Sequence, residues 1–135
     1  MKAMNEAKKV LLVDANAKLL RLLCTMIARH GHEVRVATTG GRALRDASEL
    51  RPDVIFTGML LPDCSGIDLA ARLRAMPELA HTFIVALTGY STLDCACSKV
   101  GFDYRMVKPV SIDEMIETIT LLTHGSTAPI HELHA

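Results

Sequence analysis

Three polar residues stand at the carboxyl ends of short apolar runs in this sequence: Asp14, Thr88 and Lys108. The runs have the length and aliphatic composition of strands buried in a parallel sheet. Because ligands of such sheets bind beyond the carboxyl ends of the strands, we expect a carboxylate, a hydroxyl and an ammonium group to share one edge. A lysine that points inward there needs an anion, and Asp14 is the nearest candidate. A plainer interpretation is also open, in which Asp14 is only an acid favoured by a helix dipole and Thr88 caps a helix.

The elements that would position these residues alternate between strands and helices. Asn16 can cap the first helix, and Ser111 with Glu114 forms a capping box for the last one. Pro52 and Gly101 mark helix ends. Five strands joined by short loops and helices require parallel strands with helices on both faces, a doubly wound α/β fold. The predicted strands are residues 10–13, 33–37, 54–57, 83–87 and 105–107, and a helix follows each of them, including residues 67–76 and a weak helix over 93–100.

Size and charge indicate one domain whose partners are proteins. The 135 residues are half apolar, which is enough for one shared core. We expect the domain to span residues 8–123, with residues 1–7 and 124–135 as flexible termini. Fifteen basic residues balance fifteen acidic ones, whereas a nucleic-acid-binding domain normally carries a basic excess. The sequence predicts no membrane span and no signal peptide, so the expected location is the cytoplasm.

The four cysteines and six histidines form no metal-binding pattern. Cys24 and Cys64 lie in apolar stretches, where a thiol packs as a small hydrophobic group. Cys95 and Cys97 are two residues apart, so on a helix they would point in different directions. The histidines lie mostly near helix ends or in the C-terminal tail. We therefore expect neither a metal site nor a cofactor.

Four segments together carry the likeness to a known family. They are LLVDAN (11–16), RPDVIFTGMLLPDCSG (51–66), ALTGYS (86–91) and GFDYRMVKPV (101–110). In order and spacing they resemble the response-regulator receiver domain of two-component (phosphorelay) signal transduction, over about residues 8–123. The resemblance implies a flavodoxin-like (βα)5 three-layer sandwich with strand order 2-1-3-4-5. It also implies a site in which an aspartate after the third strand accepts a phosphoryl group beside Mg²⁺.

Part of that site is present in this sequence. The resemblance assigns the first metal-binding acid to Asp14, the switch hydroxyl to Thr88 and the lysine of the site to Lys108. Pro109 is then expected to follow a cis peptide bond, as it does in the family.

Other positions of the site depart from the family. Counting back from Pro62 places the phosphoacceptor position at Gly58, which has no nucleophile. The second acid of the metal pair is Ala15, which offers no oxygen to a cation that prefers oxygen ligands. Arg105 stands where an aromatic residue is frequent, with Tyr104 one residue earlier. These two residues are the candidates for a signalling face formed by the fourth helix, the fifth strand and the last helix.

The favoured hypothesis is an aspartate-less pseudo-receiver without enzymatic activity. The intact pocket of the family holds three carboxylates and one lysine, whereas here Asp14 faces Lys108 alone. This pair is balanced, so the electrostatic reason to bind Mg²⁺ is gone. Such a module would act by phosphorylation-independent protein-protein interaction with another signalling protein: a histidine kinase, a response regulator or an output protein. A homodimer is also possible.

Two alternatives stay open. One is a phosphorylatable receiver that uses a surrogate acid such as Asp63, whose loop could bring it near the site. Thr57 and Asp53 suit this role less, because Thr57 points to the opposite side of the sheet from position 58 and Asp53 lies well before its edge. The other alternative is a flavodoxin-like cofactor binder. Residues 15–17, however, lack the glycine and hydroxyl groups of a phosphate cradle.

Overall fold

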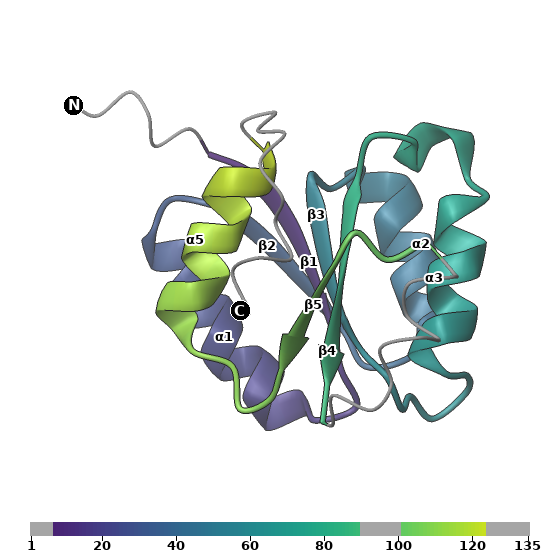
Figure 1. The fold of residues 1–135 in the computed structure, drawn as a ribbon, viewed down its shortest axis with the longest axis horizontal. Coiled ribbons are helices and arrows are strands. Elements are labelled where there is room, and N and C mark those ends of the chain that lie inside the picture. Colours follow the sequence, from purple (N-terminus) through teal and green to yellow (C-terminus); the bar gives the residue numbers. More distant parts are fainter. Residues whose placement is uncertain (1–6, 90–100, 124–135) are drawn as a thin grey trace.

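A computed structural model describes residues 7–89 and 101–123, and Figure 1 shows their arrangement. One sheet contains the strands β1 (Lys9–Val13), β2 (Glu33–Ala37), β3 (Val54–Gly58), β4 (Phe83–Thr88) and β5 (Tyr104–Val107). The described helices are α1 (Ala17–Arg29), α2 (Gly40–Leu50), α3 (Gly66–Arg74) and α5 (Ile112–Thr123), with a short 3-10 helix, η1 (Pro77–Leu79), before β4. No helix in the described ranges is long and apolar enough to cross a membrane.

The strands pair in parallel and lie in the order β2-β1-β3-β4-β5. Helices α1 and α5 cover one face of the sheet, and α2 and α3 cover the other (Figure 1). The predicted doubly wound fold and strand order are therefore confirmed. Because all the strands run in the same direction, their carboxyl ends bring Asp14, Gly58, Thr88 and Lys108 to one edge of the sheet, which we call the rim.

The sheet separates two apolar cores. Alternate residues of a strand face opposite sides, so Leu12 packs toward α1 and α5 while Leu11 packs toward α2 and α3. Every residue of β3 is buried, which fits its mostly apolar sequence. On α1, Leu20, Leu23 and Ile27 recur at helical spacing and form its buried face.

Side-chain caps fix where the helices begin. Asn16 and Ser111 each accept a hydrogen bond from the backbone N–H three residues later, at 3.1 and 3.0 Å, as the sequence predicts. Thr39 and Ser65 cap α2 and α3 in the same way. These last two caps are findings of the structure alone.

The third helix is shorter than its prediction. It spans Gly66–Arg74 rather than residues 67–76, and Met76 is extended. The residue before a proline disfavours the helical conformation, and Pro77 begins η1. The helix must therefore end before Met76.

Some predictions concern residues outside the described ranges. The helix expected over residues 93–100, with Cys95 and Cys97, is among them, and so are nearly all residues of the predicted flexible termini. The domain boundaries at residues 8 and 123 stay a prediction.

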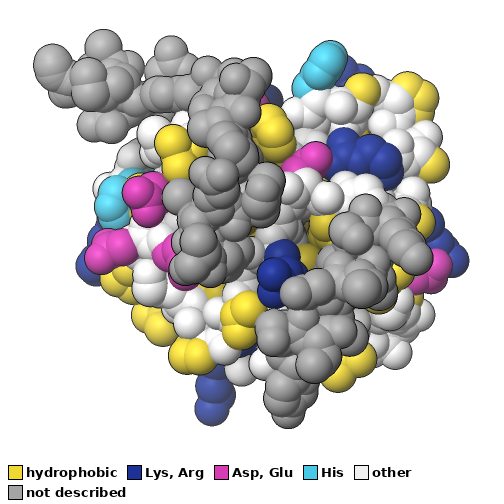
Figure 2. All heavy atoms as spheres, viewed as in Figure 1, with side chains coloured by type: hydrophobic (Ala, Val, Ile, Leu, Met, Phe, Trp, Pro, Cys, Tyr) yellow, Lys and Arg dark blue, Asp and Glu magenta, His cyan; other side chains and the backbone are white. Residues whose placement is uncertain are grey.

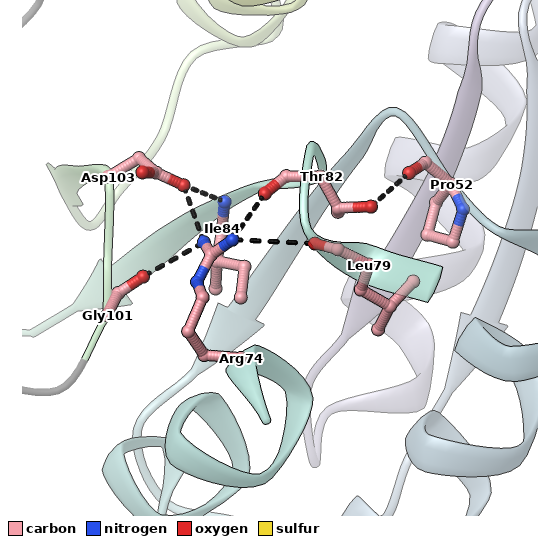
Figure 3. A network of polar contacts seen from close by, with 7 residues as sticks. All are labelled: Pro52, Arg74, Leu79, Thr82, Ile84, Gly101 and Asp103. Atoms are coloured by element: carbon pink, nitrogen blue, oxygen red, sulfur yellow. Dashed lines mark hydrogen bonds and ion pairs between the residues drawn. The ribbon is translucent and has the colours of Figure 1, made fainter. Parts of the chain in front are cut away.

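The edge of the sheet opposite the rim is held by Arg74 of α3 (Figure 3). Its guanidinium donates to the carbonyl oxygens of Thr82 (3.1 Å) and Gly101 (3.0 Å) and to the carboxylate of Asp103 (2.8 Å). The same Asp103 oxygen accepts the backbone N–H of Ile84 at 2.8 Å. One arginine thus ties the start of β4 to the segment that leads into β5.

We predict that Arg74→Met lowers the free energy of unfolding by about 1–3 kcal/mol, because it leaves half-buried acceptors without a donor. Urea denaturation measures the loss. Arg72→Met on the same helix is the matched control, since the Arg72–Asp68 ion pair is 3.6 Å long and both side chains are exposed. That change should cost less than about 1 kcal/mol, and equal losses in the two variants would contradict the role assigned to Arg74.

Candidate functional site

An ion pair joins the carboxyl ends of β1 and β5 at the rim. Lys108 Nζ lies 2.6 Å from Asp14 Oδ2, and the backbone N–H of Asn16 donates to Asp14 Oδ1 at 2.9 Å. Asp14 is only 5% exposed, while the side chain of Lys108 is one-third exposed. A buried carboxylate needs such partners, because an unpaired charge at this depth is costly. The sequence prediction that Lys108 finds its anion in Asp14 is confirmed.

Gly58, the last residue of β3, lies directly against this ion pair. A Cβ atom at position 58 would lie 2.7 Å from Asp14 Oδ2, closer than real contacts allow. The carboxylate of Asp14 therefore occupies the space into which a side chain at position 58 would project. Its Oδ2 is held there by Lys108.

A cavity of about 380 Å³ opens at the rim beside Gly58. Beyond the ion pair, its walls are apolar side chains and small residues, and Leu60 at its border is 85% exposed. The lining residues are Asp14, Gly58, Met59, Leu60, Ser65, Ile67, Leu87, Gly89 and Lys108.

Thr88 and Ala15 flank the ion pair. The backbone N–H of Lys108 donates to the carbonyl oxygen of Thr88 at 2.7 Å. Thr88 is fully buried, and its hydroxyl has no hydrogen-bond partner within the described residues. Ala15 lies exposed in the loop between β1 and α1 and adds no polar group to the rim. The Lys108–Pro109 peptide bond is cis, as expected.

The two candidate residues of the signalling face point to opposite sides of β5. Tyr104 is buried in the core beneath α1 and α5, and this burial raises the pKa of its hydroxyl to about 12, helped by the nearby charges of Glu114 and Glu117. Arg105, the next residue, is half-buried and pairs in register with Ala86. The assignment of Tyr104 and Arg105 to a signalling face stays a prediction, with Arg105 the more accessible of the two.

The carboxylate of Asp63 is bound at the start of α2. Its Oδ1 accepts the backbone N–H of Gly40 at 2.8 Å, and its Oδ2 accepts that of Gly41 at 2.9 Å. These two hydrogen bonds lower the pKa of the carboxyl group. Asp63 is not among the residues that line the rim cavity.

The donor set of the cavity does not fit Mg²⁺. Asp14 alone among the lining residues carries a carboxylate, and both of its oxygens already have partners. Ala15 and Gly58 offer no side-chain oxygen to an ion that requires near-octahedral oxygen coordination. Within the described ranges, no group of three His, Cys, Asp or Glu residues could hold a metal ion.

Comparison with known proteins identifies the family. The family model of the response regulator receiver domain matches residues 10–120, most of the chain. The chain belongs to the response regulator receiver family. Receivers are signalling domains of two-component systems, and the fold described above, with its rim at the carboxyl ends of the strands, is their fold.

The chain is similar to several individual response regulators. The transcriptional regulatory protein KdpE of Mycobacterium tuberculosis is 34% identical over 119 residues, which cover 88% of this chain and 52% of that protein. The polar-differentiation response regulator DivK of Brucella anthropi is 31% identical, covering 83% of this chain and 93% of that one. The structure of chemotaxis response regulator CheY4 of Vibrio cholerae superposes with a TM-score of 0.81 at 25% identity, covering 87% and 99%. The chain spans about half the length of the first curated relatives it matches.

Sequence reasoning found the polar part of the receiver rim and missed its apolar part. Met59 and Leu60 line the cavity from the loop after β3, where no hydrophobic period marks them, and Ile67 lines it from the start of α3. The role of Asp63 was missed for the same reason, since a contact with α2 depends on how the loop folds.

We predict that Lys108→Met lowers the free energy of unfolding by about 2 kcal/mol, because it leaves the carboxylate of Asp14 buried without a counter-charge. The exposed third of the Lys108 side chain keeps the loss below that of a fully buried pair. Chemical denaturation measures it. The double variant Asp14→Asn/Lys108→Met removes both charges and should recover part of the stability; a double variant less stable than Lys108→Met would contradict the role assigned to the ion pair.

A second prediction concerns acid pH. Because the folded-state pKa of Asp63 lies below its unfolded value, its stabilisation is complete above the unfolded pKa and is lost as the pH falls through the folded pKa. Asp63→Ala should therefore lower the melting temperature at neutral pH, and the difference from the unmodified chain should shrink in strong acid. Asp63→Asn, which keeps one acceptor oxygen, should lie between them. If the difference in melting temperature between Asp63→Ala and the unmodified chain does not change with pH, the ionised carboxylate of Asp63 does not stabilise the start of α2.

Proposed function

We propose that this receiver has lost its phosphoacceptor and acts by phosphorylation-independent interaction with another signalling protein, without enzymatic activity. The observation that carries the proposal is Gly58. It ends β3 at the rim, beside Asp14 and Lys108, where the resemblance puts the phosphoacceptor. A glycine has no side-chain oxygen to attack a phosphoryl donor.

The charges at the rim support the same proposal. Phosphoryl transfer depends on positioning the group and neutralising its anionic oxygens with metal and lysine. Here Lys108 is neutralised by Asp14 at 2.6 Å, and there is no carboxylate excess to recruit a divalent cation. In a site with several carboxylates, two like charges about 4 Å apart would repel by about 4 kcal/mol at an effective dielectric of 20. This rim avoids that repulsion without a metal.

The contacts of Asp63 disfavour the alternative of a surrogate acceptor. Both of its oxygens accept backbone hydrogen bonds from α2, and their release would leave the N–H groups of Gly40 and Gly41 without partners. The lowered pKa of Asp63 also makes its carboxylate a weaker nucleophile. For these reasons we prefer a module that does not accept phosphate.

The partner is proposed to be a protein of the same signalling class: a histidine kinase, a response regulator or an output protein. Formal charges that sum to zero speak against a nucleic-acid partner, and Figure 2 shows side chains of both signs spread over one face of the molecule. A location in the cytoplasm, where such partners work, is part of the proposal.

Intact-mass spectrometry after incubation with a small phosphodonor and Mg²⁺ tests the proposal. We expect no gain of a phosphoryl group, because neither Gly58 nor the bound carboxylate of Asp63 can accept one. We also expect a melting temperature that does not respond to millimolar Mg²⁺. A stable phosphoryl adduct on any carboxylate at useful yield would refute the proposal.

The double variant Ala15→Asp/Gly58→Asp is the matched positive control. With Asp14 it places three carboxylates at the rim against Lys108, and their repulsion gives Mg²⁺ a reason to bind. The new side chain at position 58 also displaces Asp14 Oδ2 from its present place. We expect this variant to melt at a higher temperature with Mg²⁺ than without it. An unresponsive double variant would mean that the rim differs from the family by more than these two residues.

A further inference from the structure

The two helices on one face of the sheet carry opposite charges. Helix α1 contains three basic residues and no acid, whereas α5 contains three acids and no basic residue. The two helices contact each other and lie side by side over the same core (Figure 1). Although the net charge of the chain is zero, positive and negative charges are therefore separated between α1 and α5 on this face of the sheet. The residues are Lys18, Arg21 and Arg29 on α1 and Asp113, Glu114 and Glu117 on α5.

Five of these six charged side chains form no ion pair within the described part of the chain. Lys18, Arg21 and Arg29 are exposed, as are Asp113 and Glu117, and none of the five forms an ion pair with another described residue. Elsewhere on the surface, α2 and α3 do pair their charges. Nor do the cations in the first turns of α1 serve the helix itself, since positive charge there opposes the helix dipole. Helix stability accounts for Arg29 at the end of α1 and for Asp113 and Glu114 at the start of α5, where the helix dipole favours their charges, but not for Lys18, Arg21 or Glu117.

An exposed apolar side chain lies among the basic residues of α1. Leu22 is 58% exposed, although it follows Arg21 directly on a helix whose other leucines are buried or half-buried. It is one turn from Lys18 and two turns from Arg29. A surface that combines an exposed leucine with charges of one sign, next to a helix of the other sign, fits a protein partner of complementary charge.

We propose that this partner is a second copy of the chain, which binds through the same face. Helices α1 and α5 both run back antiparallel to the strands and so are parallel to each other. A two-fold axis that is parallel to both helices and lies just outside the molecule, in front of the line where they meet, places α1 of one copy against α5 of the other, and the reverse contact follows by symmetry. Each basic helix then faces an acidic one, and this contact occurs twice in the interface. The opposite arrangement, α1 on α1, would bring like charges together.

In this interface Leu22 is the apolar contact, and the charges determine how the two copies are oriented. Exposed ion pairs add little affinity one by one, so a buried side chain must provide much of it. The charges decide instead which helices face each other and how fast the copies associate. The self-association is independent of phosphorylation and does not rest on the function proposed for the rim.

A charge-swap experiment with the full chain tests this interface by sedimentation velocity over a range of protein concentrations. The variant Lys18→Glu/Arg21→Glu makes both helices acidic, and Asp113→Lys/Glu117→Lys makes both basic. We expect each variant alone to dimerise at least about tenfold more weakly than the unmodified chain, because two like-charged contacts replace two complementary ones. Mixed in equal amounts, the two variants should form a heterodimer as tight as the original dimer, because both contacts are again complementary.

Further variants distinguish the proposed face from the rest of the molecular surface. Leu22→Ala should weaken dimerisation roughly tenfold, and raised salt should weaken it by screening. Arg45→Glu on α2 and Arg105→Glu on β5 change the charge outside the proposed face, so dimerisation should be unaffected in both variants. Weaker dimerisation of the Arg105→Glu variant would indicate that the interface includes β5 instead. Far-ultraviolet circular dichroism checks that each variant is folded. A chain that stays monomeric at all concentrations, or variants whose mixture does not associate, would overturn the proposal.

Discussion

The rim of this receiver depends on one ion pair that crosses the sheet. Asp14 follows β1 and Lys108 follows β5, and in the strand order β2-β1-β3-β4-β5 two other strands lie between them. The lysine reaches the carboxylate over the end of β3, which Gly58 leaves bare. A Cβ at position 58 would meet the oxygen that Lys108 holds. The absence of a side chain at Gly58 and the position of the ion pair are therefore parts of one structural arrangement.

The same pair bears on how the edge strand is held. Among the described strands, β5 pairs with β4 alone, so it has half the hydrogen-bonding neighbours of a central strand. At its start, Asp103 is bound to Arg74, and at its end, Lys108 is bound to Asp14. These two ion pairs connect the edge strand to α3 at one end and to the loop after β1 at the other. Arg105 therefore lies on a strand whose two ends are each held by an ionic contact.

The sequence predicted the strands well and the loops poorly, for a physical reason. Buried strands and amphipathic helices leave periodic apolar patterns, and parallel topology alone brings Asp14, Thr88 and Lys108 to one edge. Contacts made by loops leave no such pattern. The binding of Asp63 to α2 and the apolar walls around Gly58 depend on loop conformation, which no local period encodes. The predicted end of the third helix was wrong because apolar spacing continues past Arg74, whereas a proline constrains the residue before it.

Under the function proposed above, the contacts of this receiver are regulated by something other than phosphorylation. A ligand or modification shifts an equilibrium only through a difference in its interaction with two states, and a rim that is already neutral offers a phosphoryl group little to act on. Association must then follow the concentrations of the partners and the ionic strength, since exposed charges are screened by salt. The separated charges of α1 and α5 fit this kind of control. They act on every encounter without any covalent change, and they select partners by sign rather than by phosphorylation state.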